Sequence, residues 1–143
     1  YQYYETICGG SGAGSTFNGT DAVQTHMTNS RLTDPEILES RFPVLLEQFA
    51  IRENSGGQGQ YCGGNGVIRQ LQFRQPMGAS ILSNRRRVVP FGLQGGKPGQ
   101  VGENRLIRAN GEEFILDSCV DVMMQNGDRL VIKTPGGGGF GAV

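Results

Sequence analysis

The chain has 143 residues, with 13 Lys and Arg against 13 Asp and Glu, and so carries no formal net charge at neutral pH. This length suits one domain, and the neutral balance gives no general attraction to nucleic acid or anionic membranes. Apolar runs stay well short of the about 18 residues that span a bilayer, so we expect a cytoplasmic protein without nucleic-acid or membrane partners. Glycine is the compositional anomaly, with 24 copies.

The glycines are clustered rather than periodic. The clusters are residues 9–14, 56–66, 92–99 and 136–141. Without a fixed repeat they are neither collagen nor a solenoid, and the interleaved Tyr, Cys, Phe and Leu residues are untypical of flexible linkers. We therefore expect the glycines to form tight, shaped loops on a β scaffold.

The first predicted element is a short helix. Asp34 offers an N-cap side chain, Pro35 suits the first turn, and Glu36 adds an early acidic group. Pro43 cannot continue a helix, so the helix is expected to end near Phe42.

Strands follow the helix. The runs that predict them are residues 44–52, 67–74 and 79–83. In the second run, Val67, Leu71 and Phe73 share one face, which is typical of a strand buried on one side.

Two Gly-containing turns follow. Asn110-Gly111 joins residues 106–109 to residues 112–116 and predicts a hairpin with a type I′ turn. Asn126-Gly127-Asp128 predicts a turn into a strand over residues 129–134. The expected fold is mainly β, a β-sandwich or open barrel-like sheet with one or two short helices and glycine-rich loops, in a single domain over residues 1–143.

No glycine cluster satisfies a phosphate-binding signature. Lys97 follows two glycines but precedes Pro98, so the hydroxyl residue of a P-loop is missing. Gly136, Gly138 and Gly141 match G-x-G-x-x-G, but we expect the match to be accidental because no helix follows. Consecutive glycine N–H groups could still form an anion-binding nest, with a plain tight turn as the alternative.

A dense polar stretch surrounds the one histidine. His26 could be a general base or metal ligand oriented by Asp21 or Asp34, and the alternative is a hydrogen-bonded structural histidine. Asn29, Arg31 and Asp34 could bind a carboxylate and an amide, and the alternative is a loop that satisfies its own backbone.

One basic run and three cysteines complete the candidates. Residues 85–87 are three arginines that could clamp an anion, but adjacent extended side chains alternate in direction, and we expect a solvated turn. Cys8, Cys62 and Cys119 lack the short spacing of a zinc site, and their odd number favours three reduced thiols.

Longer strings carry a family resemblance. In order, the chain contains YYET, GGSGAG, HMTNSRLTDPEILESRFP, SGGQGQYCGGNGVIR, GLQGGKPG and TPGGGGFG. These strings resemble the 5-oxoprolinase family, which is allied to hydantoinase B and the large subunit of acetone carboxylase. The segment TNSRLTDPEILESR is more similar to 5-oxoprolinases than to the carboxylases. Cys62 stands where the family pattern has an arginine, which puts an anion-binding role of that loop in doubt.

The resemblance implies a C-terminal part of the hydantoinase-B-like half of an ATP-dependent lactam hydrolase. Such an enzyme converts 5-oxo-L-proline to L-glutamate in glutathione metabolism, and the fragment is expected to be inactive alone. ATP and Mg²⁺ are implied for the complete enzyme, with no cofactor or metal in this fragment. Implied partners are the hydantoinase-A-like ATPase half, the small lactam and further copies of the full enzyme in a homo-oligomer.

Within this interpretation the polar stretch becomes the candidate site. His26 would be catalytic and manage the proton of the attacking water, while Arg31 would pair the substrate carboxylate and Asn29 would orient the ring amide. Asp34 would complete the substrate-binding set. The alternative function is a structural or subunit-docking module of a hydantoinase B or an acetone-carboxylase-like enzyme.

Overall fold

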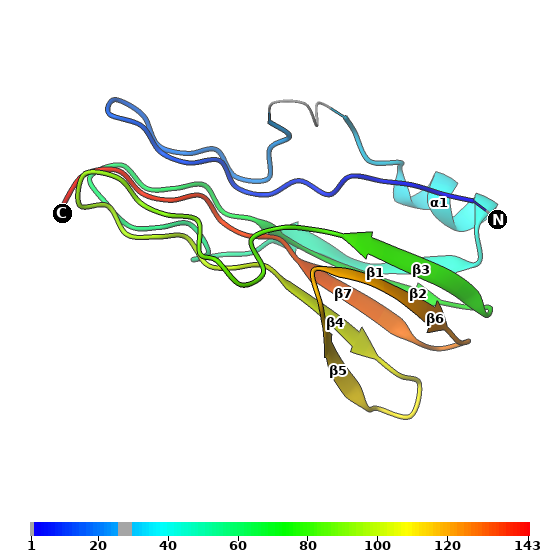
Figure 1. The fold of residues 1–143 in the computed structure, drawn as a ribbon. Coiled ribbons are helices and arrows are strands. Elements are labelled where there is room, and N and C mark those ends of the chain that lie inside the picture. The colour runs from blue at the N-terminus through cyan, green and yellow to red at the C-terminus, as the bar shows by residue number, and fades with distance from the viewer. Residues whose placement is uncertain (1, 26–29) are drawn as a thin grey trace.

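The computed structural model describes residues 2–25 and 30–143, and it places a β-sheet region beside long extended segments (Figure 1). The elements are α1 Pro35–Arg41, β1 Val44–Ile51, β2 Val67–Phe73, β3 Met77–Leu82, β4 Glu103–Ile107, β5 Glu113–Leu116, β6 Cys119–Met124 and β7 Arg129–Lys133. The expected mainly β class is confirmed. Among the described residues neither sheet closes into a barrel.

Two antiparallel sheets form the β region. Five strands pair in the order β1-β2-β7-β4-β5, and β3 pairs with β6 as a separate ribbon. Leu130 of β7 lies opposite Leu71 of β2 and Leu106 of β4, which gathers apolar side chains on one face. The buried core cluster also contains Ile81 of β3 and Met124 of β6, so the ribbon packs on that face.

Helix α1 has the ends that the sequence predicts. The Asp34 carboxylate accepts the Glu36 N–H at 2.9 Å, and the Phe42 N–H donates to the Leu38 carbonyl at 3.0 Å. Leu38 is 1% exposed and joins the core cluster. No helix in the described part of the chain is long and apolar enough to cross a membrane.

A buried arginine interrupts the apolar face of β2. Arg69 is 2% exposed, and its guanidinium donates to both oxygens of Glu5 at 2.7 and 2.9 Å. The guanidinium carbon also lies 5.1 Å from the centre of the Phe49 ring. This bidentate pair compensates the burial of both charges and fastens the N-terminal segment to the sheet.

The predicted hairpin between β4 and β5 is present, but its turn differs from the type I′ turn expected. Gly111 has a φ of +94°, whereas Asn110 does not have a positive φ, and type I′ requires both. The Gly111 N–H donates to the Arg108 carbonyl at 2.9 Å, and the Arg108 N–H donates to the Glu112 carbonyl at 2.8 Å. This pattern is a three-residue loop with a glycine bulge.

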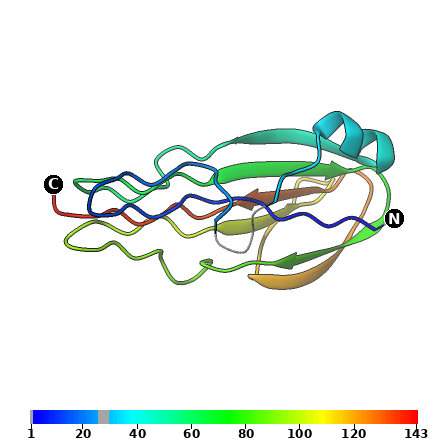
Figure 2. The same ribbon diagram turned by 90° about the horizontal axis from the view of Figure 1, so that it is seen from above.

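The glycine clusters do not fold mainly as tight loops. They lie in extended segments that run side by side away from the sheet (Figures 1 and 2), namely residues 9–14, 19–23, 55–66, 91–100 and 134–141. We call this set of segments the glycine bundle.

Backbone hydrogen bonds of the glycine bundle repeat every three residues. The N–H groups of Thr134, Gly137 and Phe140 donate to the carbonyl oxygens of Val67, Gly64 and Tyr61, at 2.9, 2.8 and 2.8 Å. The N–H groups of Gly136 and Gly139 donate to the carbonyls of Gln100 and Lys97, and those of Gly10 and Ala13 donate to the carbonyls of Pro135 and Gly138. A period of three is that of polyproline II helices, which have no internal hydrogen bonds. Residues 134–141 thus bond to neighbours in three directions, whereas a β-strand has only two.

Close backbone contact explains why the bundle needs glycine. A Cβ atom on Gly137 would overlap the carbonyl of Ser11, and one on Gly63 would overlap the carbonyl of Gly137. Gly136, Gly137, Gly138 and Gly139 are all buried. The same argument accounts for glycine at the axis of collagen.

The cysteines differ in access. Cys8, Cys62 and Cys119 are free thiols, and they are respectively buried, half-buried and exposed. Burial raises the pKa of the Cys8 thiol, so less of it is thiolate at neutral pH.

We predict that Gly137→Ala destabilises the protein by about 3 kcal/mol or more. Overpacking ordinarily costs about 1–3 kcal/mol, and here a backbone carbonyl rather than a mobile side chain obstructs the new methyl group. Gly78→Ala in β3 is the control, because nothing lies within 4 Å of a Cβ at that position. Urea unfolding should place Gly78→Ala within about 1 kcal/mol of the wild type, and equal losses for both variants would refute the packing argument.

The order of thiol modification is a second prediction. With a chromogenic disulfide reagent at neutral pH, Cys119 should react first and Cys8 last, because only a thiolate in contact with solvent reacts quickly. Cys119→Ser should remove the fastest phase alone. Loss of the slowest phase in that variant would contradict the assignment.

Candidate functional site

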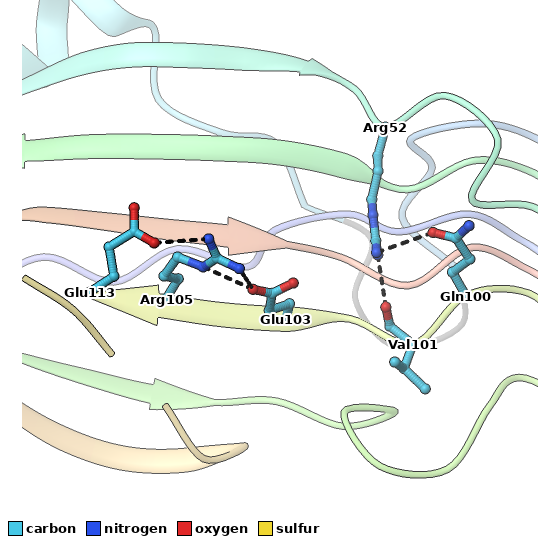
Figure 3. Close-up of polar contacts among 6 residues, drawn as sticks. All are labelled: Arg52, Gln100, Val101, Glu103, Arg105 and Glu113. Atoms are coloured by element: carbon cyan, nitrogen blue, oxygen red, sulfur yellow. Dashed lines mark hydrogen bonds and ion pairs between the residues drawn. The ribbon is translucent and has the colours of Figure 1, made fainter. Parts of the chain in front are cut away.

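The candidate site lies where the glycine bundle meets the sheet. Arg52 follows β1, and its side chain crosses the ends of β2 and β7 (Figure 3). Its Nη1 donates to the carbonyls of Val101 at 2.8 Å and Thr134 at 3.0 Å, and its Nη2 donates to Gln100 Oε1 at 3.3 Å. These bonds fix the guanidinium at the start of β4.

Arg86 reaches the same place from the loop after β3. Its Nε donates to Asn104 Oδ1 at 3.1 Å and its Nη1 donates to the Asn84 carbonyl at 2.7 Å. Asn104 is 1% exposed and also donates to Ser83 Oγ at 3.0 Å, so it is a rigid partner. The Arg86 guanidinium packs directly against Gly102, where a Cβ atom would lie 2.3 Å from Nη1.

The three consecutive arginines alternate in direction, as the sequence predicted. Arg85 and Arg87 are exposed, and Arg87 pairs with Asp117 at 3.3 Å on the surface. The expected solvated turn is nevertheless wrong for Arg86, which points inward to Asn104.

Both inward guanidinium groups are partly removed from water. Burial lowers the pKa of Arg86 to about 10, and the nearby charge of Arg52 acts in the same direction. Burial also lowers the pKa of Arg52, against the opposite effect of Glu103. Both groups remain protonated at neutral pH. The ion pairs formed among the described residues include neither of them, so two partly buried positive charges lack a carboxylate partner.

A small pocket connects these groups, and we call it the two-arginine pocket. It has a volume of about 210 Å³ and is lined by Arg52, Arg86, Val101, Gly102, Glu103, Asn104, Ile115 and Leu116. Glu103 is held in place by Arg105, whose Nε donates to Oε1 at 2.9 Å and whose Nη2 contacts the same oxygen (Figure 3). The two-arginine pocket thus offers two guanidinium groups, one carboxylate and an apolar wall. These groups can bind a small anion that carries a hydrogen-bond donor.

A larger, more open depression beside the β4–β5 hairpin is a weaker candidate. Its buried acidic group, Asp128, accepts from Arg108 Nη1 at 2.6 Å, from the Gln125 N–H at 2.8 Å and from the Ala109 N–H at 2.9 Å. These bonds tie two turns together, so the carboxylate has a structural role.

Two of the four sequence-predicted site residues are described, and both fall outside the two depressions. His26 and Asn29 lie outside the described residues. Arg31 and Asp34 are exposed, and neither lines either depression. One oxygen of Asp34 caps α1. The site predicted from His26, Asn29, Arg31 and Asp34 therefore stays a prediction. Arg52 and Arg86 were not among its residues.

Neither the last glycine cluster nor any group of three or more described His, Cys, Asp or Glu side chains forms a ready site for ATP and Mg²⁺. The N–H groups of Gly136, Gly137, Gly139 and Gly141 all donate to backbone carbonyls, so they cannot also form a phosphate-binding nest. No group of three or more His, Cys, Asp or Glu side chains in residues 2–25 and 30–143 could hold a metal ion.

Comparison with known proteins matches residues 1–143 to the family model described as hydantoinase B/oxoprolinase. The chain is 54% identical to 5-oxoprolinase 1 of Arabidopsis thaliana over 99% of its length and 11% of that protein. Its fold matches the ATP-dependent caprolactamase of Pseudomonas jessenii with a TM-score of 0.79 and 27% identity, covering 95% of this chain and 25% of that one. Acetone carboxylase shares the fold, with a TM-score of 0.73 and 20% identity, over 94% of this chain and 22% of that one. The chain spans only 11–12% of the length of the first relatives it matches.

Proposed function

Because the chain belongs to the hydantoinase B/oxoprolinase family, we propose that it is part of an ATP-dependent cyclic-amide hydrolase that opens 5-oxo-L-proline to L-glutamate. The observation that carries this proposal is the 54% sequence identity with a 5-oxoprolinase over 99% of the chain. The structural similarity to a caprolactamase supports a lactam as the substrate class. Acetone carboxylase shares the fold alone and does not favour carboxylation.

In this proposal the chain contributes binding and scaffolding to a larger enzyme. The remainder of that enzyme is its main partner, since the relatives are far longer than this chain. Binding of ATP and Mg²⁺ elsewhere in the complete enzyme, inactivity of this segment alone, a role in glutathione metabolism, a cytoplasmic location and homo-oligomeric assembly belong to the same proposal. The rigid glycine bundle and the sheet hold the loops that would face the substrate.

The complete polypeptide that contains this chain should form glutamate from 5-oxoproline, with ADP appearing in parallel. Neither product should form when 5-oxoproline or Mg-ATP is omitted. Amino-acid analysis and a coupled ADP assay measure the two products. Turnover of hydantoin, caprolactam or acetone with no turnover of 5-oxoproline would reject the proposed substrate.

We further predict a catalytic role for His26 in the complete enzyme. His26→Ala should lower kcat by about a hundredfold or more at an unchanged Tm, because general acid–base groups contribute about 10²–10⁴ in rate. Ser30→Ala, four residues away, is the control and should keep kcat. A lower Tm with nearly unchanged kcat would assign His26 a structural role and favour a supporting module.

A further inference from the structure

We propose that the two-arginine pocket binds the carboxylate of the substrate, with Arg52 and Arg86 facing the carboxylate and Glu103 facing the neighbouring ring N–H. This inference deepens the proposed function and rests on it for the identity of the ligand. It differs from the sequence-based expectation, which gave the carboxylate to Arg31.

The charged side chains in and beside the pocket leave an excess of positive charge. Arg52, Arg86 and Arg105 contribute three positive charges, and Glu103 and Glu113 contribute two negative ones. Arg105 is already paired, with Glu103 on one side and with Glu113 at 3.2 Å on the other (Figure 3). The remaining positive charge therefore lies on the two guanidinium groups that burial already disfavours, and one carboxylate would neutralise it.

Unused donors remain on both arginines. A guanidinium has five N–H donors. The hydrogen bonds given above for the described residues occupy three on Arg52 and two on Arg86. The described part of the chain contains no sealed side-chain nitrogen or oxygen without a partner, so Arg52 Nε and Arg86 Nη2, which form none of these bonds, are in contact with solvent. These donors are the groups that would receive carboxylate oxygens.

The size of the pocket selects a small ligand. A volume of about 210 Å³ is below the about 300–1,000 Å³ of sites for drug-sized ligands. A nucleotide is too large for it. A five-membered lactam with one carboxylate is of suitable size, and its methylene groups can contact Val101, Ile115 and Leu116.

The polarity of the pocket matches the order of groups in 5-oxoproline. In that molecule the carbon that bears the carboxylate is bonded to the ring N–H, so an acceptor is needed beside the arginines. Glu103 lines the pocket, and its negative charge stabilises the protonated form of Arg52. Arg105 binds Oε1 of Glu103 and orients the group, which leaves Oε2 to accept the N–H.

Three other arrangements share part of this chemistry. The carboxylate could be bound by Arg31, the pocket could receive an Asp or Glu side chain from another part of the polypeptide, or the arginines could serve the fold alone. A comparison of ligands with and without the carboxylate separates these arrangements. The ligand 2-pyrrolidinone is 5-oxoproline without its carboxylate.

The test is calorimetric titration of the complete polypeptide, without ATP, with 5-oxoproline and with 2-pyrrolidinone. Arg86→Gln should weaken 5-oxoproline binding at least about 30-fold, since truncation of one partner in a buried charge pair has effects of that order or larger. It should change 2-pyrrolidinone binding less than about threefold. Arg86→Lys should restore part of the affinity. Arg87→Gln, from the same run but on the surface, is the matched control and should bind both ligands like the wild type.

Several outcomes would overturn the inference. Equal weakening of both ligands together with a lower Tm would give Arg86 a structural role, and a 5-oxoproline loss in Arg31→Gln alone would assign the carboxylate to Arg31. Wild-type protein that does not bind 5-oxoproline at millimolar concentration would also overturn it, as expected if another segment fills the pocket. Glutamate production by the wild-type enzyme is measured separately. If the enzyme is active but Arg86→Gln binds 5-oxoproline normally, only the proposed role of the two-arginine pocket is rejected. Absent glutamate production rejects the proposed function itself.

Discussion

The structure depends on backbone-to-backbone contact along residues 134–141. Each turn of this segment places a carbonyl or N–H group of a different neighbour where a side chain would otherwise stand. The stabilising groups are thus the peptide units themselves, most of which bond to peptide units of neighbouring segments. Among the described residues, the apolar core cluster lies at the sheet, where Leu38, Phe73 and Met124 are buried.

The two-arginine pocket arises from the change between two backbone repeats. The sheet pairs residues with a period of two, the glycine bundle with a period of three, and the segments exchange one pattern for the other near Thr134 and Val101. Carbonyl groups at such a boundary match neither repeat. Arg52 donates to two of these carbonyls, those of Val101 and Thr134. The same bonds hold its positive charge in a site that is partly removed from water.

Local signals in the sequence were sufficient for the elements that depend on neighbouring residues. The caps of α1, the alternation in β2 and both glycine turns are visible because the interacting residues are close in the chain. Strand β6 was missed although Val120, Val122 and Met124 alternate with exposed residues, since Asp121 makes the run resemble a loop. The glycine bundle was not predictable, because each glycine serves a partner far away in the sequence. Arg69 and Arg86 were hidden for the same reason, as Glu5 and Asn104 are distant along the chain.

The position of the central segment has a consequence for the order of folding. Residues 134–141 follow every other segment of the glycine bundle along the chain, yet they bond to most of those segments. During synthesis the earlier segments emerge before the central one, so the hydrogen bonds that residues 134–141 make to them form last. The bonds between residues 134–141 and residues 9–14 join positions that are almost the whole chain apart. Such long-range contacts slow folding, and they lengthen the time for which the unfolded chain is exposed to chaperones and proteases.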